Sequence, residues 1–143
     1  MGIVASQSIK NTIITYLGIG IGAINTLFLY TKFLTEDYFG LVVFLLSTAN
    51  LMMPILMFGV NNSLIKFYSS YKTRKLQNNF LTFMLFLPLL FIIPIGFIGS
   101  LAYETIATWL AKENGIIKDY TWLIYIIAIA LAYFEVFFSW SKI

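Results

Sequence analysis

The residues of this chain that could bind a polar ligand are few, and most of them lie inside long apolar stretches. In the first stretch, amides, hydroxyls and glycines fall within about 100° of one another on a helical wheel: Asn11, Thr15, Gly18, Gly22, Asn25 and Thr26. One interpretation is close helix packing, in which Gly18 and Gly22 admit a second helix and Asn25 hydrogen-bonds across the interface. The other is a hydrated cavity in which Asn25 and Thr26 contact a polar substrate.

Glu135 is the one acidic residue inside a predicted membrane span, and such residues are candidate functional sites because a charge in hydrocarbon is costly. On a helix it lies about 22 Å past Tyr120, close to one boundary of a hydrocarbon layer roughly 30 Å thick. Two interpretations stay open: a boundary charge that reaches water or meets Lys142, and a carboxylate that lines a cavity or couples transport to an ion. The residues sharing its helix face are small, which favours contact with protein or water over lipid: Ala128, Ala132 and Ser139.

Polar and kinking residues also interrupt the second and third apolar stretches. Ser47 and Asn50 lie close to one face of the second stretch, together with Pro54. Proline lacks the N–H that a helix needs and leaves a carbonyl without its partner. Ser47 and Asn50 are therefore further cavity candidates, and Pro54, Pro88 and Pro94 are candidate hinges.

The composition excludes several kinds of chemistry. The chain has no Cys and no His, which removes disulfides, thiolate or imidazole metal sites and histidine-based catalytic triads. We therefore expect no catalytic residue, no metal, no cofactor and no enzymatic activity. The net charge is +3, but four of the nine cations lie close together, which favours a determinant of membrane topology over a nucleic-acid surface.

The elements that must position these residues are membrane-spanning helices. Of the 143 residues, 60% are hydrophobic and 10% are charged, whereas soluble domains have about 45–50% and about 25%. A helix needs about 20 apolar residues to cross a bilayer, and uncharged stretches cover residues 11–31, 38–65, 76–103 and 120–134. We predict an all-α membrane protein with four transmembrane helices in a single transmembrane region, at about 8–33, 39–67, 80–101 and 120–140.

The distribution of cations predicts how these helices are oriented. Lys66, Lys72, Arg74 and Lys75 fall around the connection between the second and third helices, whereas the other two connections carry one and two cations. Because cytoplasmic loops carry the excess of Lys and Arg, this connection should lie in the cytoplasm. With four spans, both ends of the chain are then cytoplasmic.

Two segments resemble a known family of membrane proteins. Leu34 to Leu46 reads LTEDYFGLVVFLL, and Phe58 to Tyr71 reads FGVNNSLIKFYSSY. They resemble the acidic–aromatic–Gly turn that opens the second helix, and the element that closes it, in bacterial polysaccharide exporters. These are the O-antigen or lipid-linked oligosaccharide flippases of the multidrug/oligosaccharidyl-lipid/polysaccharide exporter superfamily. The similarity covers most of the chain in helix order and loop character.

The resemblance implies a transporter of 12–14 helices in two lobes around a central cavity, located in the bacterial inner membrane. It implies an undecaprenyl-linked oligosaccharide as substrate, with membrane lipids and the remaining helices of the full-length transporter as partners. Four helices are fewer than one lobe, so we expect the chain to be the N-terminal part of a longer protein. Away from their ends, the spans contain no Arg or Lys that could hold the pyrophosphate of such a substrate. In this the chain departs from the family.

Two other hypotheses stay open at the level of sequence. A multidrug or metabolite antiporter of the same superfamily would need an embedded acidic residue, for which Glu135 is the candidate. A small four-helix accessory subunit would need no cavity at all.

Overall fold

The computed structural model describes the backbone of residues 3–112 and 114–143, with the side chains of residues 3–7 and 11 left out. The described backbone is almost entirely helical and contains no strand. Four segments are long and apolar enough to cross a membrane: Ser8–Phe33, Glu36–Met57, Arg74–Leu101 and Ile116–Trp140. The predicted all-α architecture, with four segments long and apolar enough to cross a membrane, is therefore confirmed.

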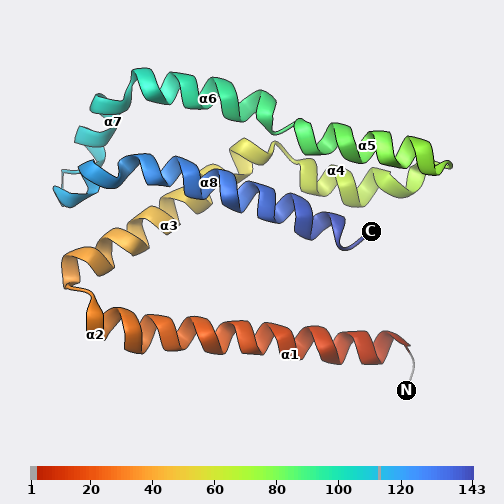
Figure 1. The fold of residues 1–143 in the computed structure, drawn as a ribbon, viewed down its shortest axis with the longest axis horizontal. Helices are drawn as coiled ribbons and strands as arrows, with labels where there is room; N and C mark the ends of the chain where they lie inside the picture. The colour runs from red at the N-terminus through yellow and green to blue at the C-terminus, as the bar shows by residue number, and fades with distance from the viewer. Residues whose placement is uncertain (1–2, 113) are drawn as a thin grey trace. The chain divides into compact units, whose positions relative to one another are not determined.

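The chain divides into two compact units, Met1–Gly40 and Leu41–Ile143, which we call unit 1 and unit 2. In unit 1, α1 (Ile3–Ile24) continues through a π-helical segment, η1 (Asn25–Tyr30), into α2 (Thr31–Phe33) (Figure 1). The chain becomes extended at Leu34 before α3 (Glu36–Met57) begins. The predicted first helix, 8–33, thus corresponds to one helix with a wider π turn at its far end.

The second predicted helix, 39–67, is wrong as a continuous element. The structure has α3, then a break at Phe58 and Gly59, then α4 (Val60–Phe67) and a short 3-10 turn, η2 (Tyr68–Ser70). Phe58 and Gly59 have φ angles of 48° and 71°, a left-handed conformation that glycine adopts without strain and phenylalanine does not. The Phe58 ring stacks on the Phe91 ring at 3.8 Å between centroids, which holds this strained residue in place.

The third predicted helix, 80–101, begins six residues too late and is also divided. Its two parts are α5 (Arg74–Phe86) and α6 (Leu89–Leu101). The expected basic loop is short because Arg74 already lies in the first turn of α5, where the Thr73 hydroxyl accepts the Leu76 N–H at 3.4 Å. Pro88 lies between the two helices, and its missing N–H explains the interruption.

The fourth predicted helix, 120–140, begins earlier than expected, because α8 runs from Ile116 to Trp140. The preceding segment is not a simple loop, since α7 (Tyr103–Leu110) occupies half of it. This short helix packs on α8 and on α6. Its Ala107 is fully buried.

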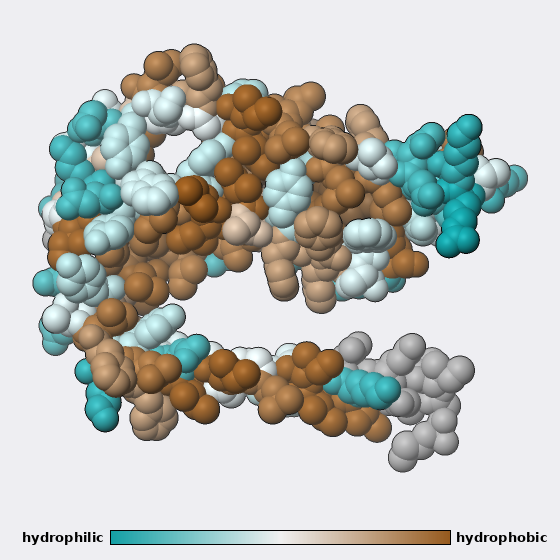
Figure 2. Space-filling model, viewed as in Figure 1, coloured by the Kyte–Doolittle hydropathy of each residue, from teal (hydrophilic) through white to brown (hydrophobic). Residues whose placement is uncertain are grey.

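The core of unit 2 is a seam between α8 and the α3–α4 region, and α4 packs directly on α8. Along α8, Ala128, Ala132 and Val136 are 0% exposed. The opposing side chains are also nearly inaccessible, namely Leu56, Val60 and Leu64. The outward side chains of unit 2 are largely hydrophobic between two more hydrophilic ends (Figure 2), as expected for a surface in contact with hydrocarbon.

Candidate functional site

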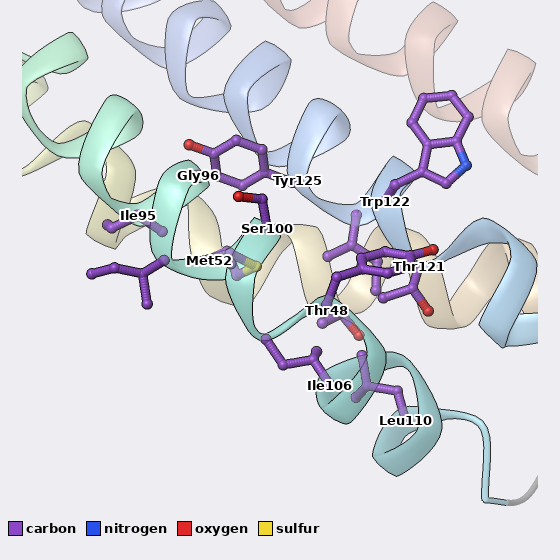
Figure 3. A pocket seen from close by; sticks show the side chains of 14 residues that line it. Thr48, Met52, Ile95, Gly96, Ser100, Ile106, Leu110, Thr121, Trp122 and Tyr125 are labelled. Atoms are coloured by element: carbon purple, nitrogen blue, oxygen red, sulfur yellow. The ribbon is translucent and has the colours of Figure 1, made fainter.

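Unit 2 contains an apolar pocket of about 550 Å³, within the range of small-ligand sites. It lies between α3, α6, α7 and α8 (Figure 3). Its wall is formed almost entirely by carbon atoms. The lining residues are Thr48 and Met52 of α3; Ile95, Gly96, Ile98, Gly99 and Ser100 of α6; Tyr103, Ile106 and Leu110 of α7; and Thr121, Trp122, Ile124 and Tyr125 of α8.

The hydroxyl groups around the pocket mostly donate to backbone carbonyls. Ser100 Oγ donates to the Phe97 carbonyl at 2.7 Å, and Thr121 Oγ1 donates to the Ile117 carbonyl at 2.8 Å. The Tyr103 hydroxyl donates to the Lys118 carbonyl at 3.2 Å. With these donors in use and a wall that is almost entirely carbon, the pocket offers few hydrogen-bond donors to an occupant. The pocket therefore suits a hydrocarbon group better than a sugar.

Tyr125 closes the pocket wall against a glycine of α6. Its ring extends from α8 toward α6 (Figure 3), and its hydroxyl donates to the Ile92 carbonyl. A Cβ atom added at Gly96 would lie 2.8 Å from the Tyr125 hydroxyl oxygen and 3.0 Å from its ring. The absence of a side chain at Gly96 is thus what allows the tyrosine to approach.

A second tyrosine of α8 makes a similar contact near the break between α5 and α6. The Tyr133 hydroxyl donates to the Leu85 carbonyl at 3.3 Å, three residues before Pro88. Carbonyls at interrupted turns in a membrane need new partners, because water is absent there. Tyr125 and Tyr133 therefore tie both parts of the interrupted helix to α8.

Ser47 and Asn50 do not line this pocket. Both are exposed on α3, on the face away from the buried Leu45 and Ala49. The Asn50 side chain donates to the carbonyl of Leu46, one turn earlier, at 2.9 Å. Thr48, the residue after Ser47, borders the pocket instead. The predicted candidates therefore lie on a different face of α3 from the pocket.

Glu135 lies outside the pocket as well. It is half-buried near the end of α8, beside the buried Val136. Its predicted neighbours Ala128, Ala132 and Ser139 are buried, which agrees with their assignment to the inward face. Lys142, the partner considered for it, lies over the Phe138 ring at 4.0 Å from the centroid.

The candidates of the first helix belong to unit 1. Asn25 begins η1 and is half-buried, whereas Thr26 is exposed. A Cβ atom at Gly18 or Gly22 would meet open space, so their role in helix packing stays a prediction. The side chain of Asn11 lies outside the described residues.

The three prolines differ in their effect on the backbone. Pro88 is fully buried and separates α5 from α6. Pro94 lies within α6 and does not interrupt it. Pro54 lies within α3, and its carbonyl accepts the Phe58 N–H at 3.1 Å, immediately before the break. Their role as moving hinges stays a prediction.

Sequence reasoning missed the pocket residues of α6, although a signal for them was present. Gly96, Gly99 and Ser100 fall on one helical face of a segment that is otherwise composed of bulky apolar residues. Such a face of small residues permits a close approach or leaves a hollow. Gly18 and Gly22 form a comparable face of small residues in the first apolar stretch.

Comparison with known proteins finds no similarity that bears on this site. No protein-family model, curated protein or solved structure matches the chain. The resemblance of Leu34–Leu46 and Phe58–Tyr71 to polysaccharide exporters therefore stays a prediction.

Proposed function

We propose that this chain is part of a bacterial transporter that moves a lipid-linked oligosaccharide across the plasma membrane for surface polysaccharide synthesis. The full transporter would have 12–14 helices in two lobes, of which this chain supplies four. The substrate would be an oligosaccharide carried on undecaprenyl.

The observation that carries the proposal is the presence of two interrupted apolar helices in a unit that also contains a pocket. α3 and α4 are separated at Phe58–Gly59, and α5 and α6 at Leu87–Pro88. Discontinuous helices in membranes are characteristic of transporters, where irregular backbone lies beside the substrate path.

The segments that resemble polysaccharide exporters support the proposal by their positions. Leu34–Leu46 contains the turn between α2 and α3, and Phe58–Tyr71 contains the break, α4 and η2. In the second segment Val60 and Leu64 are buried against α8. The resemblance therefore falls on turns and on the core seam.

The pocket suits the isoprenoid chain of the proposed substrate. An isoprenoid has no hydrogen-bonding groups, and the Ser100, Tyr103 and Thr121 hydroxyls that border the pocket already donate to backbone carbonyls. The sugar would have to lie elsewhere in the full transporter. Asn25, Asn50 and Glu135 remain candidates for that polar part of the path.

The proposed topology can be tested with cysteines, because the chain has none of its own. Single cysteines at Lys72 and Ile143 should react with a membrane-impermeant thiol reagent only after the membrane is opened. A cysteine at Lys112, between α7 and α8, should react in intact cells. Reaction of Lys72→Cys from outside would contradict the cytoplasmic placement of both ends.

The function itself is tested by deleting the full-length gene and measuring lipid-linked oligosaccharide in the inner leaflet. The proposal predicts that the glycolipid accumulates there and that the complete gene restores export. Unchanged levels in a strain that still synthesises the glycolipid would overturn it.

A further inference from the structure

The turn between α4 and α5 gathers cations that have no acidic neighbour along the chain. We define the basic tip as four exposed residues, Lys66, Lys72, Arg74 and Lys75. Residues 38–103 include no Asp or Glu, and none of these four cations forms an ion pair within the part of the chain that the structure describes. Hydrophilic side chains gather at this end of unit 2 in Figure 2, where α4, η2 and α5 contact one another.

The backbone of the basic tip is ordered by side chains that do not carry its charge. Gln77 Nε2 donates to the Tyr71 carbonyl at 2.9 Å, and the Thr73 hydroxyl accepts the Leu76 N–H. The Tyr71 and Phe80 rings lie 4.9 Å apart. A site whose backbone is already fixed loses less conformational entropy when it binds.

Two of these cations occupy an unfavourable position for the protein alone. Arg74 and Lys75 lie in the first turn of α5, which has no acidic residue. The positive end of the helix dipole destabilises cations there. A bound anion would remove this repulsion.

We propose that the basic tip binds the headgroups of anionic phospholipids in preference to zwitterionic ones. The tip lies at the end of the apolar segment Arg74–Leu101, and phospholipid headgroups surround the ends of a membrane-spanning helix. Each Lys or Arg near an anionic membrane surface strengthens binding roughly fivefold. This inference does not rest on the proposed function, because it needs only a chain that spans a membrane.

The test titrates the purified 143-residue chain in detergent with phosphatidylglycerol or phosphatidylcholine of identical acyl chains, and counts bound lipids by native mass spectrometry. The wild-type chain should prefer phosphatidylglycerol. The variant K72Q/K75Q should bind it roughly 25-fold more weakly, since two cations are removed. The matched control, K112Q/K118Q, removes one cation from the connection between α7 and α8 and one from the first turn of α8. It should keep the preference, because Lys118 already pairs with Glu104 at 3.3 Å.

Salt and a soluble headgroup complete the test. The preference should disappear near 1 M salt, where the Debye length falls to about 3 Å from about 10 Å at 0.1 M. An unchanged preference in K72Q/K75Q, an equal loss in both variants, or equal binding of the two lipids would overturn the proposal. So would full competition by glycerophosphoglycerol, which would show that the tip binds a soluble anion without need of a lipid.

Discussion

The two halves of α8 pack in different ways against the rest of unit 2. In the half toward the chain end, Ala128, Ala132 and Val136 are 0% exposed, and α4 packs on this helix. In the half that begins at Ile116, Thr121 and Tyr125 border the pocket. One helix thus forms both a tight seam and a cavity wall.

The difference follows from where small residues occur. In the seam, α8 contributes the small buried residues Ala128 and Ala132, and α4, which packs on α8, contributes the larger buried Leu64. At the pocket, the small residues Gly96 and Gly99 lie on α6, and Cβ positions at Gly99 meet open space. We therefore expect substitutions in the seam to have the larger effect on the free energy of unfolding. Substitutions in the pocket should have the larger effect on ligand binding.

The largest expected effect on stability is in the seam. Ala132→Leu adds volume at a position with no accessible surface, and overpacking of this kind destabilises by about 1–3 kcal/mol. Ala130→Leu, two residues earlier on the exposed face of α8, is the matched control and should change little. Reversible unfolding in detergent measures both variants. Equal losses in the two variants would show that the seam does not carry the stability of unit 2.

A smaller effect distinguishes the two glycines of α6. Gly99→Ala should stabilise by about 1 kcal/mol, because alanine favours a helix more than glycine does and its Cβ meets open space. Gly96→Ala should lack this gain, since its Cβ would displace Tyr125 from the Ile92 carbonyl at a cost of about 1 kcal/mol.

The double variant G96A/Y125F identifies the cause of that difference. The Tyr125 hydroxyl oxygen is the atom nearest to a Cβ at position 96. Phenylalanine at position 125 lacks this oxygen and so relieves the closest contact of an alanine at position 96. Unfolding free energies of the two single variants and the double variant should therefore not be additive. Additive values would show that Tyr125 and Gly96 do not constrain each other.

The smallest effect concerns the contact at the break between α5 and α6. Tyr133→Phe removes the hydrogen bond to the Leu85 carbonyl, and such bonds in membranes contribute about 0.6 kcal/mol on average. Tyr120→Phe is the control, because the structure gives that more exposed tyrosine of α8 no hydrogen bond. The same unfolding assay should show a lower free energy of unfolding for Tyr133→Phe and an unchanged one for Tyr120→Phe.

The sequence was sufficient to predict four long apolar helices but not the helix interruptions. Long uncharged stretches must become helices in a bilayer, because each backbone N–H and carbonyl then finds a partner within its own segment. The break at Phe58–Gly59 depends on a left-handed Phe58, stabilised by stacking on Phe91. That contact joins residues distant in the chain, so local patterns do not reveal it.

The site was harder to predict than the fold for a related physical reason. Ser47 and Asn50 attract attention because they are polar, yet they lie on the exposed face of α3. The pocket is bordered by Thr48, Met52 and the glycines of α6, which are inconspicuous in an apolar sequence. A hydrocarbon site has no chemical signature other than small residues facing larger ones.

The central claim is that the pocket carries the hydrocarbon chain of the transported lipid and is not a packing defect. Gly99→Leu in the full-length transporter tests it most directly, because Gly99 lines the pocket and a Cβ atom there meets open space. Export of the lipid-linked oligosaccharide should fall about tenfold, as expected when a site is overfilled, while resistance to unfolding is kept. Gly20→Leu, on α1 and likewise in open space, should export normally. Unchanged export by a folded Gly99→Leu protein would contradict the claim.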